Sequence, residues 1–127
     1  MSDKPIYWIG TSKEDIAKFP QDAKRKAGFQ LRAVQRGESP ADFKPMSVVG
    51  KGVEEIRIKA GEAYRIFYVA RFAEAVYVLH AFNKKTQKTS KKDLEIGKQR
   101  YQTAISLRKQ LGKIDERANH QRTRQYL

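Results

Sequence analysis

The chain has 127 residues, of which 39% are hydrophobic and 32% are charged, a size and composition that suit one compact domain. Its 27 Lys and Arg residues outnumber its 14 Asp and Glu residues, which gives a formal net charge of +13. Such a charge indicates an anionic partner: nucleic acid, an acidic membrane surface or an acidic protein. The absence of cysteine excludes disulfides, a thiol nucleophile and Cys-ligated metal sites.

The sequence also lacks the features of membrane, secreted and cofactor-binding proteins. No apolar run approaches the length of a membrane span, and no apolar core follows the charged N-terminus as it does in a signal peptide. We therefore expect a cytoplasmic protein without a membrane partner. Two histidines do not make a His-rich metal site, and Gly50-Lys51-Gly52 lacks the context of a phosphate-binding loop, so we expect no metal and no cofactor.

The first third of the chain predicts one short strand and two helices. Residues 6–9 form an apolar, β-favouring run. Ser12 and Asp15 have the spacing of a capping box and predict a short helix with Ser12 as its N-cap. Pro20 is expected at the first position of a second helix. Residues 38–52 contain two prolines and two glycines, which predict a loop.

The rest of the chain predicts an antiparallel meander followed by one helix. Residues 53–59 alternate between apolar and charged, and residues 64–69 and 76–83 are rich in aromatic and β-branched side chains. Ser90 begins a second capping-box pattern, and apolar residues at helical spacing predict a helix that ends at Gly112.

The predicted order is therefore β-α-α-β-β-β-α, which defines the α+β class. We expect a small antiparallel sheet packed against an N-terminal helical hairpin, with a C-terminal helix beside it and the first strand at or next to an edge. Residues 1–111 would form this single domain. Residues 112–127 are polar and basic without periodicity, and we expect them to form a basic, mobile tail.

Positive charge concentrates between positions 84 and 100, where seven basic residues occur with two acidic ones. The basic residues are Lys84, Lys85, Lys88, Lys91, Lys92, Lys98 and Arg100. Two interpretations stay open: a solvated basic surface, or a rim that binds the phosphates of RNA or DNA.

Two arginines, Arg57 and Arg65, lie within neighbouring predicted strands. Because a buried guanidinium keeps its charge, each needs a partner. That partner is either a nearby carboxylate, for which Glu54, Glu55 and Glu62 are candidates, or a bound phosphate. The residues alone leave both alternatives open.

His80 lies in the last strand of the predicted meander, where period-two alternation places it on one face with Val76, Val78, Phe82 and Lys84. A lone histidine on an apolar strand is either a core residue with a satisfied hydrogen bond or an acid–base catalyst. Phe82 likewise fits either a core position or a platform on which an unpaired base stacks.

Three segments, in this order, resemble the phage-derived toxins of the RelE/HigB superfamily. A helical hairpin precedes the segments and a helix follows them, as in that superfamily, so the resemblance covers residues 5–111. The segments are Glu55-Ile56-Arg57, then Tyr64-Arg65-Ile66-Phe67-Tyr68, then Leu79-His80-Ala81-Phe82-Asn83-Lys84-Lys85-Thr86-Gln87-Lys88-Thr89.

The resemblance implies the toxin of a type II toxin–antitoxin pair. Such toxins are metal-independent endoribonucleases, and many of them cleave messenger RNA on the ribosome and so inhibit translation. The implied partners are messenger RNA, the ribosome and a cognate antitoxin, often a helix-turn-helix protein. Homo-oligomer formation stays open.

The residues supply the chemistry for a cleavage in which the 2′-hydroxyl of the RNA attacks the adjacent phosphate. Arg57 and Arg65 are the candidates for a phosphate clamp, Lys84 for electrostatic stabilisation, and His80 for the general acid or base. Two uses of the tail stay open: His120 or Tyr126 completes the site, or the tail contacts ribosomal RNA or the antitoxin. The candidates for RNA binding are Phe82, Lys85, Lys88, Lys91 and Lys92.

Two other functions stay open. One is a basic RNA- or DNA-binding module of the same fold without catalysis. The other is a structural basic protein of a phage or ribosomal particle.

Overall fold

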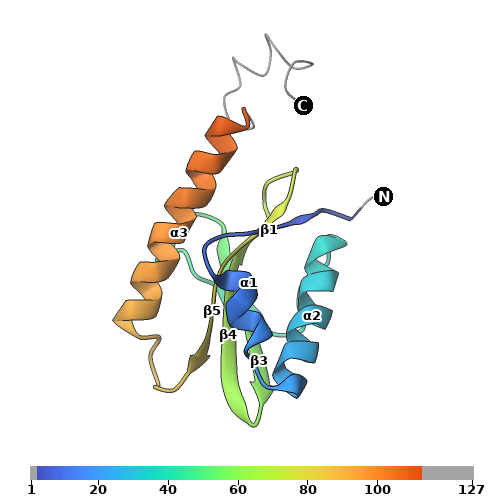
Figure 1. Ribbon diagram of the computed structural model, residues 1–127, viewed down its shortest axis with the longest axis vertical. Coiled ribbons are helices and arrows are strands. Elements are labelled where there is room, and N and C mark those ends of the chain that lie inside the picture. The colour runs from blue at the N-terminus through green and yellow to red at the C-terminus, as the bar shows by residue number, and fades with distance from the viewer. Residues whose placement is uncertain (1–2, 113–127) are drawn as a thin grey trace.

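The computed structural model describes residues 3–112 (Figure 1). The predicted tail beyond Gly112, with His120 and Tyr126, therefore lies outside the described residues. The elements follow one another as β1 (Ile6–Trp8), α1 (Ser12–Ala17), α2 (Gln21–Gln35), β2 (Phe43–Pro45), β3 (Val53–Ala60), β4 (Glu62–Val69), β5 (Val76–Lys84) and α3 (Lys91–Gln110).

The strands form one five-stranded sheet in the order β1-β5-β4-β3-β2. The predicted α+β class is confirmed, with a helical hairpin before the meander β3-β4-β5 and a helix after it. The sheet is not wholly antiparallel, because β1 pairs with β5 in parallel at the edge. The predicted loop 38–52 also contains a strand: β2 pairs with β3, and Phe43 lies opposite Ile56.

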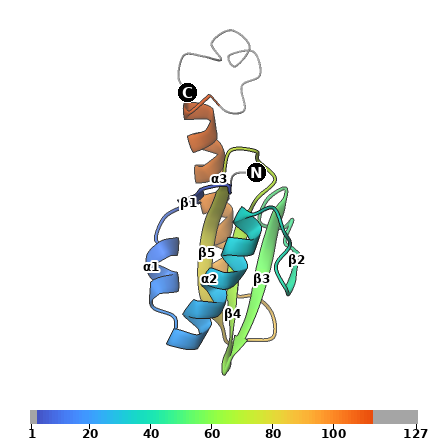
Figure 2. The same cartoon turned by 90° about the vertical axis from the view of Figure 1, so that its right-hand side faces the viewer.

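The sheet separates two apolar cores. Helices α1 and α2 cover one face and α3 covers the other (Figure 2). Leu31 of α2 packs in the first core with Ile66, whereas Ala104 of α3 packs in the second with Phe67. Helix α3 approaches the sheet closely at Gly97, where an added Cβ would lie 2.8 Å from Cδ2 of Phe67.

The start of α1 differs by one residue from the prediction. Thr11 is the N-cap residue, and its hydroxyl donates a hydrogen bond to Asp15 at 2.8 Å. Ser12 is fully buried, and its hydroxyl donates instead to the carbonyl oxygen of Val78 at 3.1 Å. Pro20 is similarly the N-cap of α2 rather than its first helical residue.

The start of α3 agrees with the prediction. Ser90 is its N-cap, and the hydroxyl oxygen accepts a hydrogen bond from the backbone N–H of Asp93 at 3.0 Å. At the other end Leu111 is the C-cap and Gly112 follows with a φ of 74°, a conformation that glycine adopts without strain.

A β-bulge in β5 changes which residues share a face. His80 lies opposite Phe67, but Val78 lies opposite the next residue of β4, so Leu79 is one additional residue in β5. The predicted common face of His80 with Val76 and Val78 is therefore wrong. Both valines pack in the core beneath α1 and α2, whereas His80 lies on the α3 side opposite Phe67.

Candidate functional site

The hairpin of β3 and β4 projects past the N-terminal end of α3 (Figures 1 and 2). Directly opposed residues of neighbouring strands point to the same side of a sheet, so the register gives the composition of this side. Three successive rows cross it on the α3 side: Lys44–Glu55–Phe67–His80, then Arg57–Arg65–Phe82, then Lys59–Ala63–Lys84. We call the surface formed by Lys44, Arg57, Lys59, Arg65 and Lys84 the cationic face.

The two predicted clamp arginines, Arg57 and Arg65, are directly opposite each other in β3 and β4. Lys84 belongs to the next row, opposite Ala63, so the structure brings these three predicted residues onto one side of the sheet. Arg57 is half-buried, and its side chain makes no hydrogen bond or ion pair with any residue between 3 and 112. Its charge is therefore available to a ligand.

Arg65 is 8% exposed and has a carboxylate beside it. Its Nε atom lies 3.8 Å from Oε2 of Glu55, and its Nη1 donates to the carbonyl oxygen of Tyr64 at 3.1 Å. Of the two alternatives left open by the sequence, an ion pair with a glutamate thus applies to Arg65. For Arg57, no carboxylate within the described residues forms one.

Lys84 is in electrostatic contact with the rest of the cationic face. Burial and the nearby Arg65 guanidinium lower the pKa of the Lys84 ammonium group. Lys44 and Arg57 lower this pKa further, whereas the Glu55 carboxylate raises it. A lowered pKa favours proton donation, which is a requirement for a general acid near neutral pH.

His80 anchors the N-terminal end of α3 to the sheet. Its side chain is 7% exposed, and Nε2 lies 2.7 Å from Oδ1 of Asp93. The other oxygen of that carboxylate accepts a hydrogen bond from Ser90 at 2.7 Å. Burial lowers the pKa of His80, although the hydrogen bond to Asp93 opposes this effect. The geometry therefore favours an anchoring role over direct contact with RNA.

Phe82 lies opposite Arg65 in the sheet and is a buried packing residue rather than an open platform for a base. It is 8% exposed, stacks on His80 with ring centroids 4.8 Å apart, and meets Phe67 edge-on at 5.2 Å. Little of the ring is left for stacking on a base, so burial favours the core interpretation of this side chain.

The connection from β5 to α3 adds exposed cations to this end of the sheet. Lys84 donates a hydrogen bond to the carbonyl oxygen of Gln87 at 2.8 Å, which folds the connection back toward the strand. Together with Glu62, Ala63 and Asn83, Lys84 and Lys85 line a hollow of about 360 Å³. Four lysines of this connection and the first turn of α3 are exposed and have no side-chain partner among the described residues: Lys85, Lys88, Lys91 and Lys92.

Two residues of the predicted basic cluster have other roles. Arg100 donates from Nη1 to the carbonyl oxygen of Leu79 at 3.2 Å and from Nη2 to the hydroxyl of Thr11 at 3.0 Å. Lys98 lies 3.7 Å from Glu95 on the same helix. Arg100 therefore supports the bulge in β5, and Lys98 is a paired surface charge.

Sequence reasoning missed Lys44 because it fell in a predicted loop. It lies opposite Glu55 in the edge strand β2 and is exposed. A three-residue edge strand carries too little alternation to reveal its facing. Lys59 was detectable, since the alternation of residues 53–59 places it on the side of Arg57.

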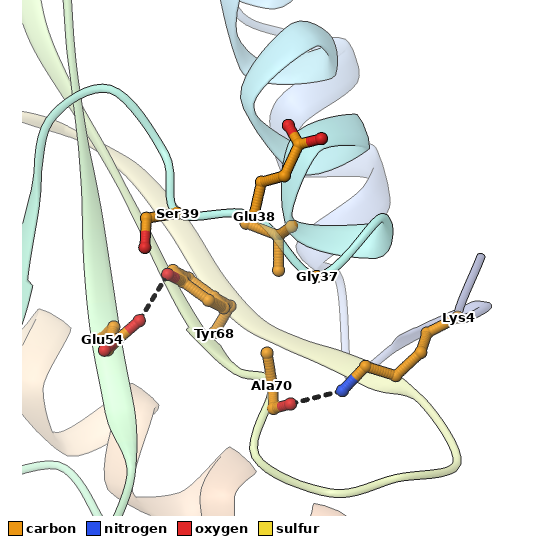
Figure 3. Close-up of a pocket in the computed structure, with 8 residues that line it drawn as sticks. Lys4, Gly37, Glu38, Ser39, Glu54, Tyr68 and Ala70 are labelled. Carbon is orange, nitrogen blue, oxygen red and sulfur yellow. Dashed lines mark hydrogen bonds between the residues drawn. The ribbon is translucent and has the colours of Figure 1, made fainter. Parts of the chain in front are cut away.

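A second hollow, of about 230 Å³, is lined by residues that do not belong to the cationic face (Figure 3). In it the Tyr68 hydroxyl donates to Glu54 at 2.6 Å, and Nζ of Lys4 donates to the carbonyl oxygen of Ala70 (Figure 3). Burial and then this hydrogen bond raise the pKa of Tyr68, so its proton stays on the hydroxyl. Because these polar groups satisfy one another, we assign the hollow no role.

Neither a membrane span nor a metal cluster is found in the described part of the chain. No helix within residues 3–112 is long and apolar enough to cross a bilayer. No group of three or more potential metal ligands comes together there either.

The fold and the site define a small α+β protein with a cationic face at one end of its sheet. The family model described as Phage derived protein Gp49-like (DUF891) matches residues 14–102. The chain therefore belongs to this Gp49-like family, and the match includes the whole cationic face. No curated protein matches the chain.

Proposed function

We propose that this protein is the toxin of a type II toxin–antitoxin pair, similar to RelE and HigB, and that it acts as an endoribonuclease. The observation that carries the proposal is the position of Arg57, Arg65 and Lys84 on one side of the sheet. Membership of the Gp49-like family, which is associated with toxins of such pairs, supports it.

In the proposed reaction the RNA supplies its own nucleophile. The guanidinium groups of Arg57 and Arg65 bind the non-bridging oxygens of the scissile phosphate. The 2′-hydroxyl gives its proton to water as its oxygen attacks the phosphorus, and the bond from phosphorus to the 5′-oxygen breaks. Negative charge grows on the non-bridging oxygens during the attack, and the two cations stabilise it. The products are a 2′,3′-cyclic phosphate and a 5′-hydroxyl, and no metal ion takes part.

Lys84 is the best-placed residue of the described chain to protonate the leaving 5′-oxygen. Its ammonium group shares the cationic face with both arginines, and burial, followed by the charges of these neighbours, lowers its pKa. His80, the acid–base candidate in the sequence, is buried and bonded to Asp93, which favours a role in holding α3 against the sheet.

The substrate is proposed to be messenger RNA on the ribosome, in the cytoplasm. Phosphates on either side of the cleaved bond would contact the exposed lysines of the β5–α3 connection, so binding would weaken as salt rises. A cognate antitoxin with a helix-turn-helix domain would neutralise the activity.

The experiment is inducible expression of the chain without a partner, followed by primer extension on messenger RNA. We expect growth arrest and cleaved messages. Arg65→Ala and Lys84→Ala should relieve both effects, while Arg25→Ala on α2 should not. If the first two variants are folded by circular dichroism and are as toxic as the parent, the assignment of the site is wrong.

A second candidate function is RNA or DNA binding without cleavage. The burial of His80 favours it, because the described residues then lack an exposed imidazole for proton transfer. This function predicts salt-sensitive binding to nucleic acid and intact messenger RNA after induction, with or without ribosomes.

A further inference from the structure

Glu55 is the only carboxylate in the three rows of described residues that form the cationic side of the sheet. It is 1% exposed. A buried carboxylate is unfavourable unless a cation or hydrogen-bond donor compensates it. The identity of that partner therefore shows what Glu55 does in the folded protein.

The partner of Glu55 is Arg65 and not Lys44. Lys44 lies directly opposite Glu55 on β2, yet its exposed ammonium forms no ion pair with a described residue. By contrast, Oε2 of Glu55 lies 3.8 Å from Nε of Arg65. The Glu55 carboxylate therefore pairs with Arg65, which is more buried than Lys44.

The contacts of Arg65 fix the guanidinium on its inner side. Nη1 donates to the carbonyl oxygen of Tyr64, and Nε is buried beside Glu55 without a hydrogen bond of its own. Nη2 also lacks a partner within residues 3–112, but it is not among the buried unsatisfied atoms. Nη2 is therefore the donor that a ligand reaches.

We infer that Glu55 is a positioning residue, whose buried carboxylate orients the guanidinium of Arg65 so that Nη2 faces a bound RNA phosphate. The inference rests on the proposed function for its RNA substrate. This positioning role differs from simple compensation of the positive charge of Arg65, which any buried carboxylate nearby would provide.

The first test compares Glu55→Gln with the matched control Glu54→Gln, on single-turnover cleavage of a short messenger RNA by the full chain on programmed ribosomes. Glu54 is the preceding residue, but it belongs to the other side of the sheet, where it bonds to Tyr68. We expect Glu55→Gln to lower the cleavage rate about 10-fold or more, with a smaller change in RNA affinity, and Glu54→Gln to leave both unchanged.

Two further variants separate positioning from charge compensation. Glu55→Asp keeps the charge but shortens its reach, so positioning predicts a slower enzyme, whereas compensation predicts the parental rate. In an Arg65→Ala background, Glu55→Gln should cause no additional loss. Parental cleavage by Glu55→Asp, or an equal loss from Glu55→Gln in both backgrounds, would overturn the inference.

A measurement on the RNA-free protein keeps the inference independent of the proposed function. In NMR spectra, the Nε–H of Arg65 should exchange slowly with solvent in the parent and faster in Glu55→Gln, with no change in Glu54→Gln. Equal exchange in parent and Glu55→Gln overturns the inference. Absence of RNA cleavage by the parent overturns the proposed function alone.

Discussion

The helical hairpin and the cationic face are both rich in basic residues, but the two regions differ in how those residues are paired and arranged. On the hairpin, four cations have carboxylates within ion-pair distance: Arg25 and Lys26 with Asp22, Arg32 with Asp3, and Arg36 with Glu38. Lys13, Lys18 and Lys24 have no such partner among the described residues. On the cationic face, Lys44, Arg57 and Lys59 have no carboxylate partner among the described residues. Neither net charge nor unpaired cations alone locate a binding surface. The cationic face is distinguished because its cations lie in adjacent rows on one side of the sheet.

The difference has an electrostatic reason. An exposed ion pair contributes little to stability, but it neutralises the local field that would attract an anion. Cations that converge on one side of a sheet repel one another. Burial is the largest cause of the lowered pKa of Lys84, and the charges of Arg65, Lys44 and Arg57 lower it further. A bound phosphate would relieve that repulsion.

The largest expected effect comes from removing a guanidinium of the cationic face. Arg57→Ala should lower the rate of RNA cleavage about 10²–10³-fold, because its unpaired charge is assigned to the transition state. Arg25→Ala on the hairpin should leave the rate unchanged. Equal losses in the two variants, measured by single-turnover cleavage, would remove the distinction between the two regions.

The seating of the helices on the two sides of the sheet can be compared through two glycines. Gly97→Ala in α3 would bring its new Cβ to 2.8 Å from Phe67, so we expect a loss of about 1–3 kcal/mol in the free energy of unfolding. Gly28→Ala in α2 meets no atom within 4 Å and should stabilise the protein by about 0.5–1 kcal/mol. Urea denaturation measures both, and destabilisation by Gly28→Ala would contradict this packing.

The anchoring of α3 by His80 predicts a pH dependence of stability. Because the pKa of His80 is lowered in the folded state, the unfolded chain binds the proton more tightly. This contribution to stability is full above the unfolded pKa of about 6.5 and is lost as pH falls toward the folded pKa. Thermal unfolding from pH 7.5 to 5 should show a shallower decline in His80→Gln than in the parent; identical slopes would exclude the linkage.

The smallest effect concerns paired and unpaired lysines near α3. Lys88→Ala should reduce the slope of log affinity for single-stranded RNA against log salt by about 0.7. Lys98→Ala, which removes a lysine paired with Glu95, should leave the slope nearly unchanged. Fluorescence anisotropy at several salt concentrations measures both slopes. A larger change for Lys98→Ala would place the RNA along α3 instead.

The features that the sequence could predict depend on the alternation of apolar and polar residues in strands and on capping residues at helix ends. The meander, the presence of Arg57 and Arg65 in neighbouring strands, and the capping of α3 by Ser90 each follow from local patterns that extend over several residues, whereas the register that sets the two arginines opposite each other does not. These patterns were sufficient to predict the α+β class and to place Arg57 and Arg65 in neighbouring strands, with Lys84 directly after the next one.

The remaining features depend on contacts that no local pattern encodes. Strand β2 forms only because it pairs with β3, so the facing of Lys44 was not visible. The bulge at Leu79 shifts the alternation by one residue and depends on the register of β4. The burial of Glu55 beside Arg65 likewise follows from packing across the sheet.

The most direct test of the central claim is to map RNA onto the ¹⁵N-labelled full chain by NMR, with a single-stranded RNA whose 2′-hydroxyls are replaced by hydrogen. We expect chemical-shift changes at Arg57, Arg65, Lys84 and the β5–α3 connection, with α2 unaffected. Changes confined to the basic residues of α2 would contradict this claim.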